Sequence, residues 1–180
     1  MVNTIVTKFA IGTEQGINTL LFIGAATARE KCKGKVPEDK LEEYIERHFN
    51  SDVLRVELNS MSNQYVIVYC DGEPAGYARI TSKGKRPEIF EGKTVARIAD
   101  FFVLDRFANL EVKKSLFEKC LSLCSMQQII WISEYRGHPD LHFFASYGFS
   151  KNAEIAGPQE LGLAPVYLVK DKKIINNKAF

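Results

Sequence analysis

The chain has 180 residues, of which 46% are hydrophobic and 26% charged, a composition typical of one folded domain. Its 24 lysines and arginines nearly balance 22 aspartates and glutamates, leaving a net charge of +2. This balance argues against the strong positive field with which proteins bind nucleic acid or anionic membranes. No apolar run approaches the roughly 18 residues of a membrane span, and the first residues lack a secretory-signal pattern. We therefore expect a cytoplasmic, single-domain protein over residues 1–180, with a small molecule as its partner.

The cysteines and histidines show no spacing typical of a metal site. None of the four cysteines forms a CxxC pair, and the three histidines are isolated from one another. Cys120 and Cys124 lie one helical turn apart, which suits the buried face of an amphipathic helix better than a chelate for a soft metal. We expect neither a zinc site nor a disulfide.

The first half of the chain predicts one strand, three helices and a hairpin. Thr13 precedes a helical apolar pattern, and Pro37 with two acidic residues after it begins another, as expected of helix N-termini. The Asp-Gly-Glu-Pro sequence at 71–74 is a turn signal between two β-rich runs. The predicted elements are a strand at 5–10, helices at 14–34, 38–49 and 53–60, and hairpin strands at 65–70 and 75–80.

The second half is organised around residues 94–116, which read as a strand, a turn and a helix. The apolar run at 98–104 suits a central strand buried on both faces, whereas Val112, Leu116 and Cys120 recur at helical spacing. A further strand is predicted at 128–133, a short helix at 139–146 and a last strand at 166–170. Residues 81–92 and the tail at 172–180 are polar and predicted to be loose. This order of elements predicts an α+β fold, a mixed central sheet flanked by helices.

Three stretches resemble the GNAT superfamily of acyl-CoA-dependent N-acetyltransferases: VIVYCDGEPAGYARI at 66–80, the strand-turn-helix at 94–116, and HFFASYGF at 142–149. The sequence at 52–76 is most similar to PaiA-type polyamine acetyltransferases. The resemblance implies a GNAT-like fold in which two central parallel strands splay apart at their C-terminal ends. It also implies transfer of acetyl from acetyl-CoA to a primary amine, in a small amine, a polyamine or a peptide.

The resemblance places the acetyl-CoA site at the end of the central strand and in the turn after it. Family members bind the pyrophosphate with the motif Q/R-x-x-G-x-G/A, whose positions align here with Ala108, Glu111 and Lys113. Glu111 brings a carboxylate toward a dianionic ligand, which Lys113 and Lys114 offset in part, so we expect acetyl-CoA to bind at least tenfold more weakly than to a glycine-rich turn. The implied cofactor-binding residues are Phe102, Val103, Leu104, Ala108, Asn109, Leu110, Glu111, Val112, Lys113 and Lys114.

The catalytic residues are less well matched. Phe144 stands where the family has a tyrosine acid, and we expect its ring to be packed in the core. The candidate substitutes are Asp100, Glu134 and Tyr147, with packing of the Tyr147 ring as the alternative. An unpaired carboxylate buried in an apolar strand costs free energy or has a raised pKa. Three alternatives therefore remain for Asp100: a general base, a buried hydrogen-bonded residue, or an exposed residue at a strand edge. Arg97, at odd spacing from Asp100, is expected on the opposite face of the strand.

Two hypotheses of different class follow. In the first, the chain is a GNAT-family N-acetyltransferase; in the second, it is a catalytically impaired GNAT-fold module that binds a ligand or a protein. Formation of a homodimer is a third possibility. Both main hypotheses predict an elongated cleft bordered by residues 102–104, 108–113 and 133–135. Strands that stay paired to their ends, with Arg97, Phe101 or Trp131 closing the cleft, would contradict both.

Overall fold

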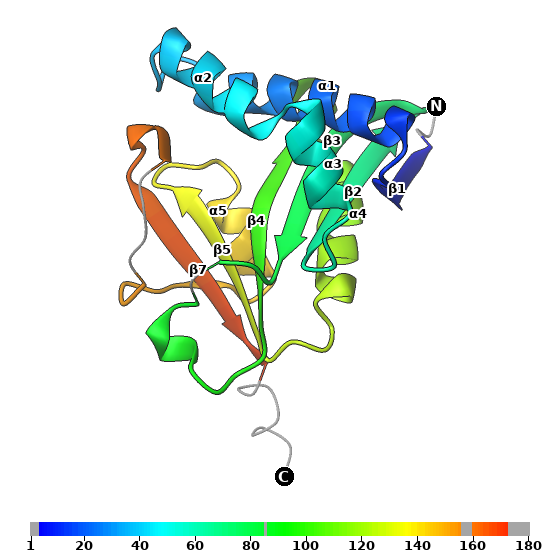
Figure 1. The fold of residues 1–180 in the computed structure, drawn as a ribbon. Helices are drawn as coiled ribbons and strands as arrows, with labels where there is room; N and C mark the ends of the chain where they lie inside the picture. Colours follow the sequence, from blue (N-terminus) through cyan, green and yellow to red (C-terminus); the bar gives the residue numbers. More distant parts are fainter. Residues whose placement is uncertain (1–3, 85, 156–159, 173–180) are drawn as a thin grey trace.

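The computed structural model describes residues 4–84, 86–155 and 160–172. Within these ranges one sheet has the strand order β1-β2-β3-β4-β5-β7-β6, and only the β4–β5 pair is parallel (Figure 1). The strands are β1 Ile5–Phe9, β2 Asn63–Cys70, β3 Glu73–Thr81, β4 Val95–Val103, β5 Ile129–Tyr135, β6 Ser150–Lys151 and β7 Pro165–Asp171. The helices are α1 Glu14–Cys32, α2 Glu38–His48, α3 Ser51–Leu58, α4 Leu110–Leu123 and α5 Leu141–Ser146, with short 3-10 turns at Glu88–Phe90, Asp105–Phe107 and Glu160–Gly162.

Helices cover both faces of the sheet. Apolar side chains of α1 and α3, among them Leu20 and Leu54, pack on β2 and β3 from one side. The larger core cluster joins the other face of the sheet to α4 and α5 and contains Phe101, Phe117 and Phe144. The predicted α+β fold with a mixed, helix-flanked sheet is therefore confirmed. Phe144 is 0% exposed, which confirms its predicted place in the core.

Local sequence explains where the hairpin turns and where two helices begin. Asp71 and Gly72 both have positive φ, 51° and 85°, which is typical of a two-residue type I′ turn, so β3 already begins at Glu73 rather than after the predicted four-residue turn. Asn50 and Asn109 accept hydrogen bonds from amides three residues on. These side-chain caps start α3 at Ser51, two residues before the predicted start at 53, and start α4 at Leu110.

The two central parallel strands separate as predicted. Their paired positions run from Val95↔Ile129 to Ile98↔Ile132, although β4 continues to Val103 and β5 to Tyr135. No further pair between these two strands follows in the part of the chain that the structure describes. The splay leaves the C-terminal edges of β4 and β5 facing each other across a gap.

A β-bulge in β4 changes which side chains share a face. Arg79 of β3 pairs with Asp100, but the next residue, Ile80, pairs with Ile98, so Ala99 is an extra residue on β4. A bulge of this kind breaks the regular alternation of a strand. Arg97 and Asp100 consequently line the same pocket, and the prediction that they point to opposite faces is wrong.

The two segments predicted to be loose, 81–92 and 172–180, each contain a residue that contacts the folded core. Phe90 is 3% exposed and packs on Val95, Ile129 and Tyr167, which anchors the connection between β3 and β4. Lys172 is tied to the core through hydrogen bonds from its ammonium group to the carbonyl oxygens of Cys124 and Ser125, at 2.7 and 2.8 Å. The rest of the predicted tail, residues 173–180, lies outside the described residues. None of the described helices has the length and apolarity to cross a bilayer.

Substituting Gly76 tests the close approach of β3 to β4. A Cβ at Gly76 would lie 2.4 Å from the Phe102 carbonyl oxygen and 2.8 Å from Val103 Cα, and both atoms are backbone. We expect Gly76→Ala to lower the free energy of unfolding by about 2 kcal/mol, the usual size of an overpacking cost. Gly12→Ala is the control, because its nearest neighbour lies at 3.6 Å. Urea denaturation of both variants with equal midpoints would contradict the prediction.

Candidate functional site

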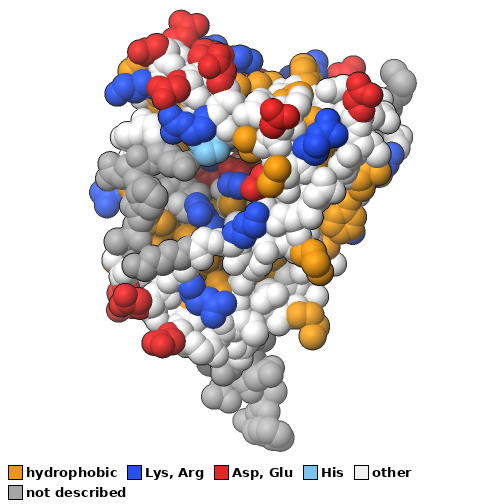
Figure 2. All heavy atoms as spheres, viewed as in Figure 1, with side chains coloured by type: hydrophobic (Ala, Val, Ile, Leu, Met, Phe, Trp, Pro, Cys, Tyr) orange, Lys and Arg blue, Asp and Glu red, His pale blue; other side chains and the backbone are white. Residues whose placement is uncertain are grey.

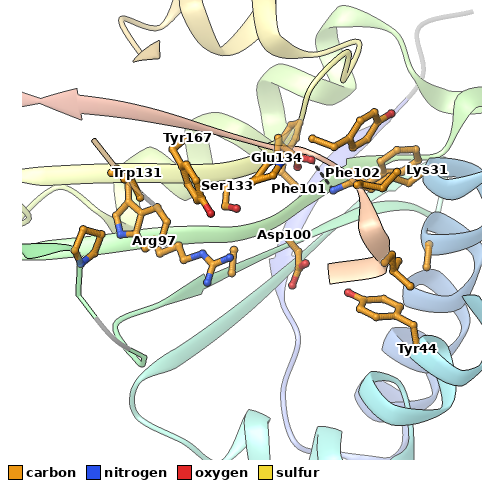
Figure 3. A pocket seen from close by; sticks show the side chains of 18 of the residues that line it. Lys31, Tyr44, Arg97, Asp100, Phe101, Phe102, Trp131, Ser133, Glu134 and Tyr167 are labelled. Carbon is orange, nitrogen blue, oxygen red and sulfur yellow. Dashed lines mark ion pairs between the residues drawn. The ribbon is translucent and has the colours of Figure 1, made fainter. Parts of the chain in front are cut away.

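A pocket of about 750 Å³ lies where β4 and β5 separate, on the side of the sheet covered by α1 and α2. Figure 2 shows the surface hollowed there, with lysine and arginine side chains gathered around the opening. Figure 3 shows Arg97 and Trp131 at one end of the pocket, Lys31 and Glu134 at the other, and Asp100 between them. The predicted cleft is therefore present on one side of the strand gap. Its predicted borders at Phe102 and at residues 133–135 line the pocket, whereas residues 103, 104 and 108–113 do not.

Glu134 of β5 forms a buried ion pair with Lys31, which comes from the last turn of α1. The Lys31 Nζ to Glu134 Oε2 distance is 2.7 Å, and the side chains are 25% and 1% exposed respectively. Burial raises the pKa of Glu134 more than Lys31 lowers it. For Lys31, burial opposes the charge, but the Glu134 carboxylate outweighs burial and raises the pKa of Lys31. Because the pKa of Asp100 is lowered and that of Glu134 is raised, Glu134 is the better proton acceptor of these two pocket carboxylates.

His138 lies behind this ion pair and is neutral at physiological pH. Its Nε2 is 3.6 Å from Glu134 Oε2, and its Nδ1 accepts a hydrogen bond from the Asp140 amide at 3.1 Å, which places the ring proton on Nε2. The ring packs near Phe102 and Phe144. Burial, reinforced by Lys31, lowers the pKa of His138 to about 3. This histidine therefore packs beside Glu134 as an uncharged ring.

Asp100 has a partner that sequence reasoning missed. Its Oδ2 accepts a hydrogen bond from Arg79 Nε on the neighbouring strand β3, at 2.7 Å. Burial alone would raise the pKa of Asp100, but Arg79, Lys31 and Arg97 together lower it. Asp100 is therefore a stable carboxylate, a weak base and an acceptor for a ligand's cation. Of the alternatives left open by the sequence, the structure shows a hydrogen-bonded, part-buried residue.

Arg97 lines the pocket, although the sequence predicted it on the face of the strand opposite Asp100. Its guanidinium carbon lies 4.8 Å from the centre of the Trp131 ring, a cation–π distance. Its Nε is buried without a hydrogen-bond partner among the described residues. The bulge at Ala99 places Arg97 in the pocket. No feature of the sequence indicates this bulge.

In the turn after β4, the predicted pyrophosphate site, two backbone amides donate hydrogen bonds to side chains of the protein itself. The Asp105 amide donates to Glu30 Oε2 of α1 at 2.8 Å, and the Val112 amide donates to Asn109 Oδ1 at 3.0 Å. Glu111 is exposed at the start of α4, with Lys114 Nζ 4.0 Å from its carboxylate. Two of the amides of this turn, those of Asp105 and Val112, therefore already have acceptors within the chain.

We predicted that Lys113 would offset part of the negative charge of Glu111, but Lys113 is paired with another carboxylate. Its ammonium group forms an ion pair with Asp140 Oδ1 at 2.5 Å, and the side chains are 20% and 7% exposed. Lys113 lies in the first turn of α4 and Asp140 directly precedes α5. The pair thus ties together the two helix N-termini at the C-terminal end of the strand gap.

Tyr147, the predicted substitute acid, lies away from the pocket. Its ring packs on Phe117 and Phe143 at centroid distances of 4.9 and 5.2 Å, within the cluster that joins the sheet to α4 and α5. Its hydroxyl donates to Glu118 Oε1 at 3.1 Å, and burial together with Glu118 raises the pKa of Tyr147. The structure therefore brings Asp100 and Glu134 together and leaves Tyr147 apart.

Comparisons with known proteins identify the fold. No protein family model matches the sequence. PaiA N-acetyltransferase from Thermoplasma acidophilum, solved in complex with coenzyme A, is 11% identical, with a TM-score of 0.75 over 93% of this chain and 99% of that one. A GCN5-related N-acetyltransferase from Rhodopseudomonas palustris is 17% identical, with a TM-score of 0.64 and coverages of 95% and 98%. A GNAT-family acetyltransferase from Streptococcus pneumoniae is 12% identical, with a TM-score of 0.59 and coverages of 93% and 99%. The chain therefore has the GNAT acetyltransferase fold.

Proposed function

We propose that the chain is an acyl-CoA-dependent N-acetyltransferase whose acceptor, a primary amine, binds in the pocket between β4, β5 and α1. The observation that carries the proposal is the gap between β4 and β5 beyond Ile98↔Ile132, which opens into a pocket lined by Asp100 and Glu134. Carboxylates attract an ammonium group, and a buried carboxylate with a raised pKa can remove its proton.

In this proposal the protein's residues bind the acceptor, hold it in place and accept its proton. Asp100 attracts the acceptor ammonium, and a carboxylate oxygen of Glu134 takes the proton that leaves nitrogen. Acetyl-CoA would supply the acetyl group as a thioester. A thiol of pKa near 8.5 leaves readily as thiolate, so the separation of Tyr147 from the pocket is compatible with turnover.

Acetyl-CoA fits one half of its expected site better than the other. Successive residues of a strand direct their N–H groups to opposite edges, and the Leu104 amide donates to Ala75 O on β3 at 2.8 Å. The Val103 amide therefore faces the gap, where it is available to an extended pantetheine arm. The phosphate half fits less well, because Glu30 and Asn109 already accept hydrogen bonds from two amides of the turn.

The test is to incubate the protein with acetyl-CoA and a panel of primary amines and to measure acetylated product by mass spectrometry. We expect slow product formation that falls at least tenfold in Glu134→Gln, which keeps the shape of the side chain and cannot accept the proton. Glu43→Gln, an exposed change on α2, is the matched control. Equal rates in wild type and Glu134→Gln would remove Glu134 from the mechanism, and the absence of product with any amine would contradict the proposal.

The second candidate function is a module with the same fold that binds an acceptor-like ligand or a protein without acetyl-CoA. It is favoured by one observation, the Lys113–Asp140 ion pair of 2.5 Å that ties the N-terminus of α4 to that of α5. Isothermal titration with acetyl-CoA and with CoA separates the two candidates, because the module is expected to show no binding.

Removing the side chain of Glu111 tests whether its carboxylate weakens the binding of acetyl-CoA. We expect Glu111→Gly to bind acetyl-CoA at least threefold more tightly than the wild type, because a carboxylate beside the phosphates is removed. The same change should cost about 1 kcal/mol of stability, since glycine is a poor helix former. Ser122→Gly, exposed in the last turn of α4, controls for the helix effect. Unchanged affinity in Glu111→Gly would show that Glu111 is not what weakens binding.

A further inference from the structure

Resting on the proposed function, we infer that the acceptor is an amine that also carries a carboxylate, an amino acid or similar amino carboxylate. Its carboxylate binds Arg97 and its amine lies toward Asp100 and Glu134. The inference narrows the acceptor class, since a polyamine or other purely cationic amine is not the ligand that this pocket fits.

The first argument is the state of Arg97. Arginine presents a planar fork of donors that matches a carboxylate, and buried polar groups nearly always have hydrogen-bond partners. Arg97 Nε has none among the described residues, although its guanidinium is fixed over the Trp131 ring at 4.8 Å. Figure 3 shows this guanidinium directed toward the middle of the pocket. A ligand carboxylate would give Arg97 the partner that the chain does not provide.

The second argument is the charge balance of the pocket walls. Glu134 is paired with Lys31 at 2.7 Å, and Asp100 is paired with Arg79 at 2.7 Å. After these two pairs are counted, Arg97 is a remaining cation. Other charged residues that line the pocket, Arg86, Glu88 and Glu154, are exposed, so solvent screens them strongly. The pocket interior therefore favours a ligand with one anionic group over a ligand with two cationic groups.

The third argument is the arrangement along the pocket. Figure 3 shows Asp100 between Arg97 at one end and the Lys31–Glu134 pair at the other. An amino carboxylate that lies along this line matches each of its charges to a group of opposite sign. A diamine in the same position would place one of its ammonium groups beside Arg97.

Trp131 provides a direct readout of binding, because it is the only tryptophan in the chain and lies against Arg97. The experiment titrates the wild-type protein with 4-aminobutyrate and 5-aminovalerate and, as matched probes of equal length, with 1,4-diaminobutane and 1,5-diaminopentane, without acetyl-CoA. We expect the amino carboxylates to change the tryptophan fluorescence and to bind at least tenfold more tightly than the diamines. Equal or tighter binding of the diamines, or no response to either amino carboxylate, overturns the inference.

A substitution at Arg97 then tests the assigned contact. We expect Arg97→Gln to weaken amino carboxylate binding at least tenfold, the usual scale of a lost hydrogen bond to a charged group, and to leave diamine binding unchanged or improved. Arg97→Lys, which keeps the charge without the fork, should restore part of the affinity. Arg47→Gln, exposed on α2, is the control. Unchanged affinity in Arg97→Gln overturns the inference, and the wild-type titration keeps it testable if that variant does not fold.

The outcomes also separate this inference from the proposed function. Tight binding of amino carboxylates with no acetylation supports the inference and contradicts the enzyme. Acetylation of diamines, with no fluorescence response to amino carboxylates, supports the enzyme and overturns the inference.

Discussion

Lys31→Met is expected to lower the free energy of unfolding by about 3 kcal/mol at pH 8, because it leaves the Glu134 carboxylate buried without its partner. Glu134 is 1% exposed and Lys31 Nζ lies 2.7 Å from it. The variant protein must either bury an uncompensated charge or protonate Glu134, and each alternative costs free energy. Methionine has a similar length to the lysine stem, so packing changes contribute little to this loss.

The reverse substitution should be much milder. In Glu134→Gln the ammonium group left behind belongs to Lys31, which is 25% exposed and lines the pocket, where water can solvate it. We expect a cost of about 1 kcal/mol or less, the scale of one hydrogen bond. Lys40→Met, an exposed change on α2, controls for the loss of a lysine. Equal losses in Lys31→Met and Glu134→Gln, measured by urea denaturation, would contradict this account of the ion pair.

The pH dependence of Lys31→Met provides a second check. Burial already raises the pKa of Glu134 in the wild type, and removal of Lys31 raises it further. Between the unfolded and folded pKa values of such a carboxyl, the folded state binds more protons, so stability falls as pH rises. The deficit of Lys31→Met relative to the wild type should therefore be smaller at pH 5 than at pH 8.

Sequence patterns predict the elements of this fold well, and they fail where a side chain or a backbone irregularity sets a boundary. The apolar pattern of the sequence predicts the central strands. The resemblance to a family predicts that these strands separate at their C-terminal ends. The early start of α3 and the start of α4 are set by Asn50 and Asn109, whose capping role depends on the local backbone. A strand's hydrophobic pattern indicates its burial and does not reveal a bulge such as the one at Ala99.

The candidate site was harder to predict than the fold, because its chemistry depends on pairs of residues far apart in the sequence. Asp100 and Glu134 stand out as acidic residues within apolar strands. Their partners, Arg79 and Lys31, lie 21 and 103 residues away in the chain, in elements that carry no sign of the pairing. Only the register of β3 against β4 and the crossing of α1 over the sheet bring these groups together. For the same reason Arg97 stayed outside the predicted site.

The phosphate half of the site shows how a fold can persist while the groups used in binding change. A turn between a strand and a helix always has unpartnered amides that need acceptors. In this chain Glu30 and Asn109 supply carboxylate and amide oxygens to Asp105 and Val112, so these two amides have acceptors without a phosphate. These two hydrogen bonds are the structural reason for which we predict weak binding of acetyl-CoA.

His138 is expected to make the stability of the protein sensitive to acid. Burial, with Lys31 as the second cause, lowers the pKa of His138 from 6.5 to about 3. The unfolded chain therefore binds more protons than the folded protein between these values, so this contribution to stability is present above pH 6.5 and is lost as pH falls. Between pH 6.5 and pH 4 the loss is on the order of 3 kcal/mol, at about 1.4 kcal/mol per pKa unit.

His138→Phe should remove this acid sensitivity. The ring packs near Phe102, Tyr135 and Phe144, so phenylalanine suits the space, but it cannot accept the hydrogen bond that the Asp140 amide makes with Nδ1. We expect the variant to be about 1 kcal/mol less stable than the wild type at pH 7 and more stable than the wild type at pH 4. His142→Phe, an exposed change on α5, should leave the slope of stability against pH unchanged. Parallel curves for wild type and His138→Phe would mean that the buried ring does not titrate in this range, and acid unfolding would then have to begin elsewhere.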